Sequence, residues 1–208
     1  MGRDGLIALW FGEPDTGTPD FIKKAAMMAL YDDHVFYAQN RGIPQLRDAI
    51  STYVSALHQR PFGVDRFTVT GSGMNAIMLA SQALIDAGDN MVTVGPVWPN
   101  CRETVHVRAG ETRLVSLQPD EAGRWTLDLD EVLAACDDRT RGIFVNSPGN
   151  PTGWVMPREQ QEELLIAARE RGLFIVADEV YVRLAYDMPH APSFLDIADE
   201  DDAVIVVN

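Results

Sequence analysis

Residues 142–178 read GIFVNSPGNPTGWVMPREQQEELLIAARERGLFIVAD, and this stretch decides the fold class. It contains two short apolar runs, residues 142–146 and 173–177, which are separated by a turn-rich segment and a charged segment. Both runs contain Val and Ile and are apolar almost throughout, which is typical of strands covered by helices on both faces. The stretch therefore predicts two buried strands.

The charged segment, residues 157–171, has the start and stop signals of a helix. Pro157 stands at its start, and Arg169 and Arg171 lie in its last turn, where the helix dipole favours positive charge. Gly172 follows as a C-cap, because glycine readily adopts the left-handed conformation that often ends a helix. A helix between two buried strands predicts a unit in which the strands are parallel.

The same alternation runs along the chain from residue 67 onward. It predicts a three-layer αβα sandwich with a mostly parallel sheet, and ligands are expected beyond the carboxyl ends of the strands. The first sixty residues differ, with a Pro/Gly-rich opening and two helices near residues 19–31 and 43–60. The expected strands are residues 67–70, 91–95, 112–117, 142–146, 173–177 and 203–207, and a further helix is expected at 75–87.

Composition argues against several classes of protein. The 208 residues are 46% hydrophobic and 23% charged, which suits one sizeable core and argues against disorder. The net charge of −14 argues against nucleic acid and anionic membrane surfaces as partners, because both attract basic patches. An anionic small ligand is compatible with this charge, because its site depends on local amides and single arginines.

Cysteine use and hydropathy indicate the compartment. Cys101 and Cys136 lie far apart without CxxC spacing, so we expect buried or incidental thiols in a reducing environment. The apolar runs are too short to span a bilayer, and the chain does not open on a basic region followed by an apolar one. We therefore expect a soluble, cytoplasmic protein.

Gly71-Ser-Gly-Met-Asn75 follows the first apolar run and opens a helix. A Gly/Ser turn at such a place leaves backbone N–H groups free, and the helix dipole favours an anion there. The pattern suits a phosphate group, although a tight strand-to-helix connection explains the same residues.

Asp178 stands at the end of the run 173–177, three residues before Tyr181. A carboxylate at that point can hold a proton on a ligand nitrogen, and the phenol can hydrogen-bond the same ligand. The alternative is an N-cap for the following segment. A metal ion is less well supported, because no histidine stands at ligand spacing from Asp178, and no metal site is expected.

Two proline-containing loops also follow apolar runs. Asn146-Ser-Pro-Gly-Asn-Pro-Thr-Gly153 is a rigid loop whose Asn side chains can face a ligand. Gly95-Pro-Val-Trp-Pro-Asn100 holds Trp98 between prolines, which suits stacking on a flat ring, although a core tryptophan is an alternative of equal weight. We further predict cis peptide bonds at Gly95-Pro96 and Asn150-Pro151.

Taken together, these segments resemble the class I/II aminotransferases, pyridoxal-phosphate (PLP)-dependent enzymes with the aspartate aminotransferase fold (fold type I). The resemblance covers nearly the whole chain, from Leu6 to Asn208. The matching motifs are Asn150-Pro-Thr-Gly153, Asp178-Glu-x-Tyr181, Gly12-Glu-Pro-Asp15, and Tyr37 followed by Gly42-x-x-x-Leu46-Arg47.

The resemblance implies which residues hold the cofactor ring. Asp178 and Tyr181 are the implied catalytic residues: Asp178 would pair with the protonated pyridine nitrogen, which keeps the ring able to accept electrons. Tyr181 and Asn150 would hydrogen-bond the phenolic oxygen of the ring. Trp98, where many relatives have Tyr or Phe, would stack on the ring, and Trp98 and Asn150 would also border the substrate.

The remaining implied contacts concern the phosphate, the substrate and a second subunit. Ser72, Gly73 and Met74 would bind the phosphate, Met74 through its backbone N–H alone because the family often has Thr there. The backbone of Gly12 would meet the α-carboxylate of the substrate. Tyr37 would reach the phosphate of the partner subunit in a homodimer.

One departure from the family pattern concerns lysine. The only lysines, Lys23 and Lys24, lie on an early helix and are expected at the surface, whereas the family has its Schiff-base lysine just after the strand that here ends at Asn208. The resemblance also implies a division into domains, in which residues 1–20 contribute to a small domain and the substrate site. Residues 21–208 would form the large PLP-binding domain, truncated before the lysine.

The implied function of the parent chain is transfer of an amino group between an amino acid and a 2-oxo acid. A PLP-dependent carbon–sulfur β-lyase of the same fold is one alternative. Another is an aminotransferase-like effector domain of a transcription regulator, which requires a winged-helix segment upstream. A fragment without any binding activity is the fourth.

The parent reading frame should continue, within about ten codons of Asn208, into a Ser/Thr-rich turn that contains a lysine. The reason is chemical: transamination needs an amine that binds PLP and then carries a proton. Sequencing the gene tests this expectation. A stop codon at that point, or no lysine, would contradict the aminotransferase interpretation.

Overall fold

The computed structural model describes Gly5, Gly12 and residues 16–208 of the chain. The chain divides into two compact units, Met1–Asn40 and Arg41–Asn208. The first unit contains helix α1 (Asp20–Tyr31), and none of the residues of this helix is buried. The sequence predicts a different boundary, at residue 20, between a segment that contributes to the substrate site and the large PLP-binding domain. That boundary stays a prediction.

The second unit is built on a sheet of five parallel strands. Its strands lie in the order β2-β1-β5-β6-β7, and every pair of neighbours is parallel. Five of the six expected strands are confirmed within about two residues at each end. Their bounds are β1 Asn90–Gly95, β2 Glu111–Ser116, β5 Thr140–Asn146, β6 Phe174–Asp178 and β7 Val204–Val207.

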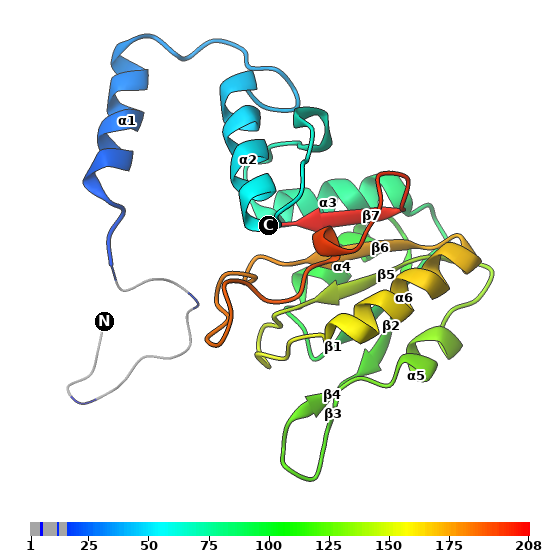
Figure 1. Cartoon of the computed structure of the whole chain (residues 1–208). Coiled ribbons are helices and arrows are strands. Elements are labelled where there is room, and N and C mark those ends of the chain that lie inside the picture. Colours follow the sequence, from blue (N-terminus) through cyan, green and yellow to red (C-terminus); the bar gives the residue numbers. More distant parts are fainter. Residues whose placement is uncertain (1–4, 6–11, 13–15) are drawn as a thin grey trace. The chain divides into compact units, whose positions relative to one another are not determined.

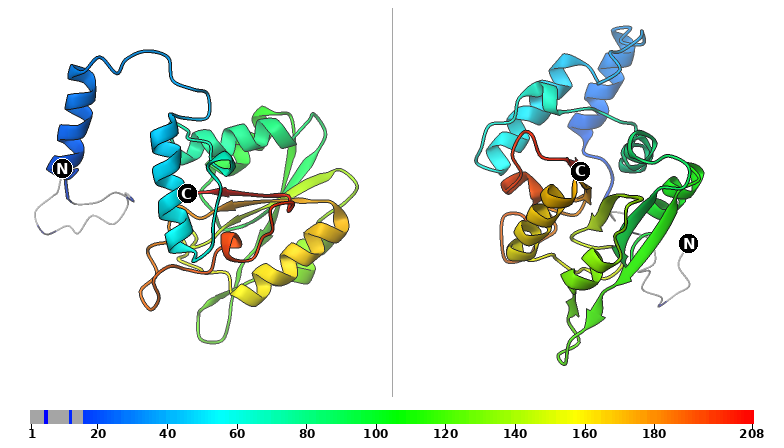
Figure 2. Two further views of the ribbon diagram at one scale, coloured as in Figure 1. Left: turned by 45° about the horizontal axis from the view of Figure 1, so that its top comes forward. Right: turned by 90° about the vertical axis from the view of Figure 1, so that its right-hand side faces the viewer.

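Helices cover both faces of this sheet, so the predicted three-layer αβα sandwich is confirmed. Figures 1 and 2 show α6 (yellow) on one face and α3 (blue-green) on the opposite face. None of the described helices is long and apolar enough to cross a membrane. The helices are α2 Pro44–Leu57, α3 Gly73–Leu84, α4 Asn100–Val107, α5 Leu129–Ala134 and α6 Arg158–Arg171, with the 3-10 turns η1 Val64–Arg66 and η2 Phe194–Asp196; a small antiparallel pair joins β3 Gln118–Pro119 to β4 Trp125–Thr126.

The two faces of the sheet make two separate cores. Alternate strand residues point to opposite faces, so Ile143 and Val145 pack against Leu164 of α6, whereas Phe144 packs against Ile77 of α3. This explains why the strands are apolar throughout rather than alternating. The helix α6 ends as predicted at Gly172, which has a positive φ of 64°.

The expected strand at residues 67–70 is wrong. These residues are extended but are not part of the sheet. Their polar groups find other partners: Val69 N–H donates to the carbonyl of Arg41 at 3.0 Å, and the Arg47 guanidinium donates to the carbonyl of Phe67 at 3.2 Å. An apolar run shows that a segment is buried or extended, but not which neighbour takes its hydrogen bonds.

The helical expectations need smaller corrections. The helix expected at residues 75–87 begins two residues earlier, at Gly73, and ends at Leu84. Two short helices, α4 and α5, were not predicted. For α5 a signal was present, because the Asp128 side chain caps it by accepting from the N–H groups of Asp130 and Glu131.

The order of the strands marks the place where a ligand is expected. β1 and β5 are neighbours; the chain runs from β1 to β2 on one side, and from β5 through β6 to β7 on the other. Connections therefore leave the carboxyl ends of β1 and β5 in opposite directions, which opens a crevice at that edge of doubly wound sheets. The Trp98 loop follows β1, and the Asn150 loop follows β5.

Replacing Leu164 by Ala should lower the free energy of unfolding by about 2–5 kcal/mol, because it leaves a cavity in the α6-side core. Ile166 lies two residues away on the same helix and is 53% exposed, so Ile166→Ala should cost less than about 0.5 kcal/mol. Urea unfolding followed by circular dichroism measures both. Equal losses for the two variants would contradict the assignment of the buried face of α6.

Candidate active site at the carboxyl edge of the sheet

Three neighbouring strands bring the predicted residues to one edge. Asn146 of β5 is in register with Asp178 of β6, and Asp178 is in register with Val207 of β7. The phosphate-type turn lies at the same edge, because a Cβ atom on Gly73 would be 3.7 Å from the Val207 side chain. This turn does not follow a strand of the sheet, whereas the Trp98 loop, the Asn150 loop and Asp178 each stand at the end of one.

Asn146 ties the loops of this edge together. Its buried side chain donates from Nδ2 to the carbonyl of Asp178 at 3.0 Å and accepts at Oδ1 from the N–H of Asn150 at 2.7 Å. Asn146 opens the loop whose Asn side chains were expected to face a ligand, but no separate role was predicted for it. Its position as the last residue of the strand and the first of the loop was the available signal.

Asn150 and Tyr181 meet although they lie 31 positions apart in the chain. Asn150 Nδ2 is 3.4 Å from the hydroxyl oxygen of Tyr181. Tyr181 sits in a turn that follows β6, in which the N–H of Val182 donates to the carbonyl of Glu179 at 2.8 Å. Two hydrogen-bonding groups that were predicted to share one acceptor on a ligand therefore lie side by side.

The Asp178 carboxyl is half-buried at the same edge of the sheet. Its Oδ1 atom accepts from the N–H of Val180 at 3.3 Å, which is the contact expected of a capping acid, but the segment that follows is a turn and not a helix. Burial raises the pKa of Asp178, since desolvation disfavours the charged form. A proton-bearing or cationic group on a ligand would relieve that cost.

Trp98 is 51% exposed, so the core-tryptophan alternative is wrong. Its carbonyl accepts from the Cys101 thiol at 3.4 Å. Burial raises the pKa of Cys101 to about 11, with the Asp178 charge a smaller contribution in the same direction.

The cis peptide bonds predicted at Gly95-Pro96 and Asn150-Pro151 are confirmed, and Ser147-Pro148 is a third that was not predicted.

The N-terminus of α3 has the geometry of an anion site. Ser72 caps the helix by accepting from the N–H of Asn75 at 3.1 Å, and its carbonyl accepts from the Thr70 hydroxyl at 2.8 Å. Within the described part of the chain no residue accepts from the N–H groups of Gly73 and Met74. Because the Met74 side chain packs against the α3-side core, only its backbone is available to a ligand.

Gly12 and Tyr37 belong to the first unit, and both are exposed. Their predicted contacts with the substrate and with a partner subunit stay predictions, and residues 13–15 of the Gly12 motif lie outside the described residues. Lys23 and Lys24 are exposed on α1 as expected, with Lys23 Nζ 3.3 Å from Asp20.

Glu179, next to Asp178, points into the protein. Its carboxylate accepts from the Ser193 hydroxyl at 2.5 Å and from the N–H of Phe194 at 2.8 Å, and only 2% of the residue is exposed. Burial raises its pKa from the ordinary 4.5 to about 7, against the lowering effect of these two hydrogen bonds. This residue was not singled out from the sequence, and it holds the turn that carries Tyr181.

The donor set suits PLP. A half-buried carboxylate fits a protonated ring nitrogen, the Asn150–Tyr181 pair fits a ring oxygen, and the N-terminus of α3 fits a phosphate. All three lie at one edge of one sheet.

Comparison with known proteins gives a family. The family model described as aminotransferase class I and II matches residues 4–208. An aspartate/prephenate aminotransferase of Thermus thermophilus is 36% identical over 185 residues, and an aspartate aminotransferase of Thermotoga maritima is 31% identical over 207 residues. These alignments cover 89% and 100% of this chain, but 48% and 54% of the relatives.

Solved structures agree with the sequence relatives. An aspartate aminotransferase of Thermus thermophilus, a single mutant, superimposes with a TM-score of 0.85 at 34% identity, covering 94% of this chain and 50% of that one. The chain thus spans about half the length of the curated relatives that it matches.

Replacing Glu179 by Gln should make stability less dependent on pH. Between pH 4.5 and about 7 the folded protein keeps a proton on Glu179 that the unfolded chain has lost, so the free energy of unfolding falls as pH rises through this window. Gln cannot titrate, so Glu179→Gln lacks this loss of stability. From pH 4.5 to about 7 the variant should therefore gain up to about 3 kcal/mol in free energy of unfolding relative to the wild type. Urea unfolding at several pH values gives this difference; a constant difference would contradict the raised pKa.

Proposed function

We propose that this chain, which belongs to the class I and II aminotransferase family, forms the cofactor-binding part of an enzyme that moves an amino group between an amino acid and a 2-oxo acid. The family depends on PLP. The observation that carries the proposal is the meeting of Asp178, the Asn150–Tyr181 pair and the N-terminus of α3 at one edge. Because the relatives named above are aspartate aminotransferases, aspartate is the first amino donor to assay.

Asp178 has the role of a counter-charge. When bound, PLP draws electrons from the bonds of the substrate carbon that carries the amino group. The Asp178 carboxylate accepts the proton-bearing ring nitrogen and keeps it charged. Because the carboxylate is half-buried, this pairing is stronger than it would be in water.

Asn150 and Tyr181 orient the opposite side of the ring. Both donate to its phenolic oxygen, one through an amide and one through a hydroxyl. Asn146 fixes the backbone of Asn150, and the turn after β6 fixes Tyr181, so neither donor depends on the ligand for its position. Trp98 covers the ring face.

The phosphate binds at the N-terminus of α3. The N–H groups of Gly73 and Met74 donate to it, and the dipole of this twelve-residue helix adds favourable charge. Ser72 contributes its hydroxyl at the cap. The family resemblance further implies that the backbone of Gly12 meets the α-carboxylate of the substrate.

We infer that a lysine outside these 208 residues supplies the amine that binds the cofactor and moves the substrate proton, because the chain spans about half the length of its relatives. Lys23 and Lys24 are not assigned this role, since both are exposed surface residues of α1. General-base chemistry requires a group within hydrogen-bond reach of the proton that it abstracts.

The enzyme acts as a homodimer in the cytoplasm, with Tyr37 reaching the partner's phosphate site. The support for a second copy is the set of apolar side chains on α1 and on the segment after it, which the described residues of their own unit leave exposed. Free cysteines support a reducing compartment, and the charge of −14 supports the absence of nucleic acid and membrane partners. The exposed apolar residues are Phe21, Ile22, Met27, Met28, Leu30, Tyr31, Val35, Phe36 and Tyr37.

The alternatives are less well supported. The relatives reported above are named as aminotransferases, which favours amino-group transfer over carbon–sulfur cleavage.

Asp178→Ala should lower turnover of the full-length enzyme by at least about a hundredfold, because the ring nitrogen loses its counter-charge. Asp187→Ala is the matched control, since Asp187 is an exposed acid in the loop after β6. Transamination of aspartate with 2-oxoglutarate, and the visible spectrum of the bound cofactor, are measured for both. Near-normal turnover of Asp178→Ala would show that this residue has been misassigned.

A further inference from the structure

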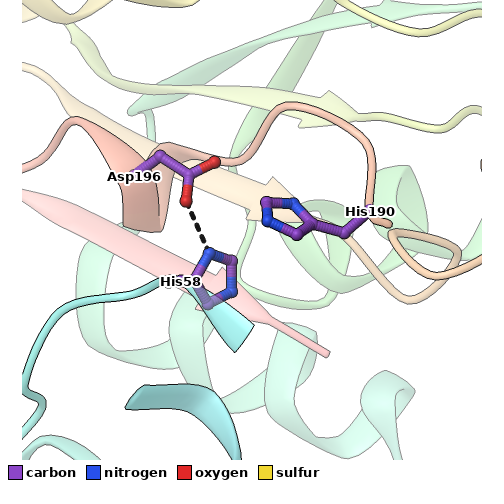
Figure 3. A group of neighbouring side chains, drawn as sticks. All are labelled: His58, His190 and Asp196. Carbon is purple, nitrogen blue, oxygen red and sulfur yellow. Dashed lines mark hydrogen bonds and ion pairs between the residues drawn. The ribbon is translucent and has the colours of Figure 1, made fainter. Parts of the chain in front are cut away.

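A second group of chemically active side chains lies away from the carboxyl edge. His58 follows the end of α2, His190 lies in the loop between β6 and η2, and Asp196 is the last residue of η2. Figure 3 shows their polar ends turned toward one another. One ligand atom from each residue lies within 4.8 Å of the other two. Within the part of the chain that the structure describes, these three residues form the cluster of side chains spaced closely enough to hold a metal ion.

The hydrogen bonds of His190 determine which of its nitrogens is free. Its Nδ1 atom is 2.8 Å from the carbonyl oxygen of Ala191, and a carbonyl can only accept, so Nδ1 carries the proton. In the neutral ring Nε2 then has a lone pair. An imidazole whose second nitrogen donates to a backbone carbonyl is the usual arrangement of a metal-binding histidine.

Asp196 is held in the same manner. One of its carboxylate oxygens accepts from the N–H of Ser193 at 3.2 Å, which completes a capping box. The other accepts from His58 Nδ1 at 2.7 Å. The His58 side chain is 1% exposed and the Asp196 side chain 14%, so both are withdrawn from water.

The site therefore has two imidazoles and one carboxylate, and His190 and Asp196 are each held by a contact outside the group. Zinc takes such mixed nitrogen and oxygen ligands, whereas magnesium and calcium prefer oxygen alone. Ligand atoms around a tetrahedral zinc ion are about 3.4 Å apart. The His58–Asp196 pair must open slightly to reach that spacing, and the atoms that are farthest apart must approach by about 1.4 Å or less.

We propose that His58, His190 and Asp196 form a zinc-binding site with a fourth position open to water. On binding, His58 Nδ1 gives up the proton that it shares with Asp196. A neutral ring takes that proton up on Nε2, and a ring protonated on both nitrogens releases it to solvent, so a neutral imidazole remains in either case. The nitrogen and the carboxylate oxygen that shared the proton then both coordinate the ion. The proton and the metal thus compete for the same pair of atoms. The proposal does not depend on the proposed aminotransferase activity.

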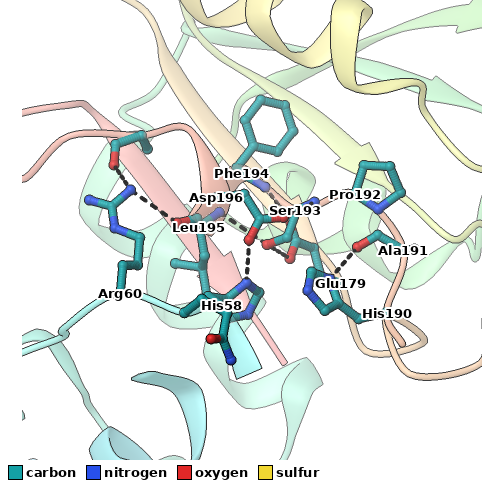
Figure 4. A network of polar contacts seen from close by, with 12 residues as sticks. His58, Arg60, Glu179, His190, Ala191, Pro192, Ser193, Phe194, Leu195 and Asp196 are labelled. Atoms are coloured by element: carbon teal, nitrogen blue, oxygen red, sulfur yellow. Dashed lines mark hydrogen bonds and ion pairs between the residues drawn. The ribbon is translucent and has the colours of Figure 1, made fainter. Parts of the chain in front are cut away.

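The ion would join three segments behind the turn that carries Tyr181. Figure 4 shows that Asp196 and Ser193 lie beside Glu179, whose carboxylate accepts from the Ser193 hydroxyl and the Phe194 N–H. On the other side, Arg60 donates to the carbonyls of Leu195 and Ala198 at 3.2 and 3.0 Å. The zinc ion would therefore have a structural role, because it would join the end of α2 to η2.

The test is zinc binding by the protein at its full natural length, without a histidine tag. After treatment with a chelator and removal of free PLP, isothermal titration with zinc chloride should give one ion per chain. His190→Ala and Asp196→Asn should each weaken zinc binding by at least about tenfold. Asn keeps an oxygen that can accept from His58 or Ser193, so the fold should survive in that variant.

The matched control is His106→Ala. His106 is also a histidine near a carboxylate, 3.6 Å from Glu103, but the pair is exposed on α4. This variant should bind zinc as tightly as the wild type, and magnesium chloride should give no heat of binding at this site. Zinc should also raise the thermal unfolding midpoint of the wild type and not that of His190→Ala.

Two results would overturn the proposal. The first is no stoichiometric zinc binding by the wild type. The second is equal zinc affinity of His190→Ala and His106→Ala, which would indicate adventitious binding at surface groups. If Asp196→Asn does not fold, His190→Ala decides alone, because among the described residues His190 makes a hydrogen bond only with the Ala191 carbonyl.

Discussion

Two hydrogen bonds from one buried amide, that of Asn146, hold the carboxyl edge of the sheet together. One fixes the carbonyl of Asp178 on the neighbouring strand, and the other fixes the N–H of Asn150 in the loop that follows. A buried amide that loses such partners is costly, since its polar atoms cannot turn to water. The loop after β5 and the turn after β6 are therefore positioned by one side chain, before any ligand is present.

The adjacent acids Asp178 and Glu179 show how the end of a strand separates two functions. Successive residues of a strand point to opposite sides, so one carboxyl faces the crevice and the other faces the protein. Glu179 receives two hydrogen bonds that anchor residues 193 and 194. Asp178 receives only the Val180 N–H among the described residues, which leaves its carboxylate with capacity for a ligand proton. The fully buried Glu179 is thus a structural anchor, and the half-buried Asp178 is a binding group.

Tertiary packing overrode the sequence pattern in two instructive places. Residues 67–70 are as apolar as the true strands, yet their backbone groups bond to Arg41 and to the Arg47 side chain. The turn that follows still reaches the carboxyl edge, because α3 packs its first turn against Val207. For Trp98 the pattern left core and ligand-facing positions equally open, and only its exposure decided between them.

By itself the sequence determined the parallel sheet, its helical covering, the ends of α6 and the loops that carry Trp98, Asn150 and Asp178. Those features depend on local periodicity, on proline and glycine, and on short motifs, which are all legible within a few residues. Only the tertiary structure decided that Asn146 joins two loops, that Glu179 faces inward, and that His58 meets His190 and Asp196. Those contacts bring together residues that lie far apart in the chain, and no local pattern encodes which distant groups the packing of helices on a sheet will place side by side.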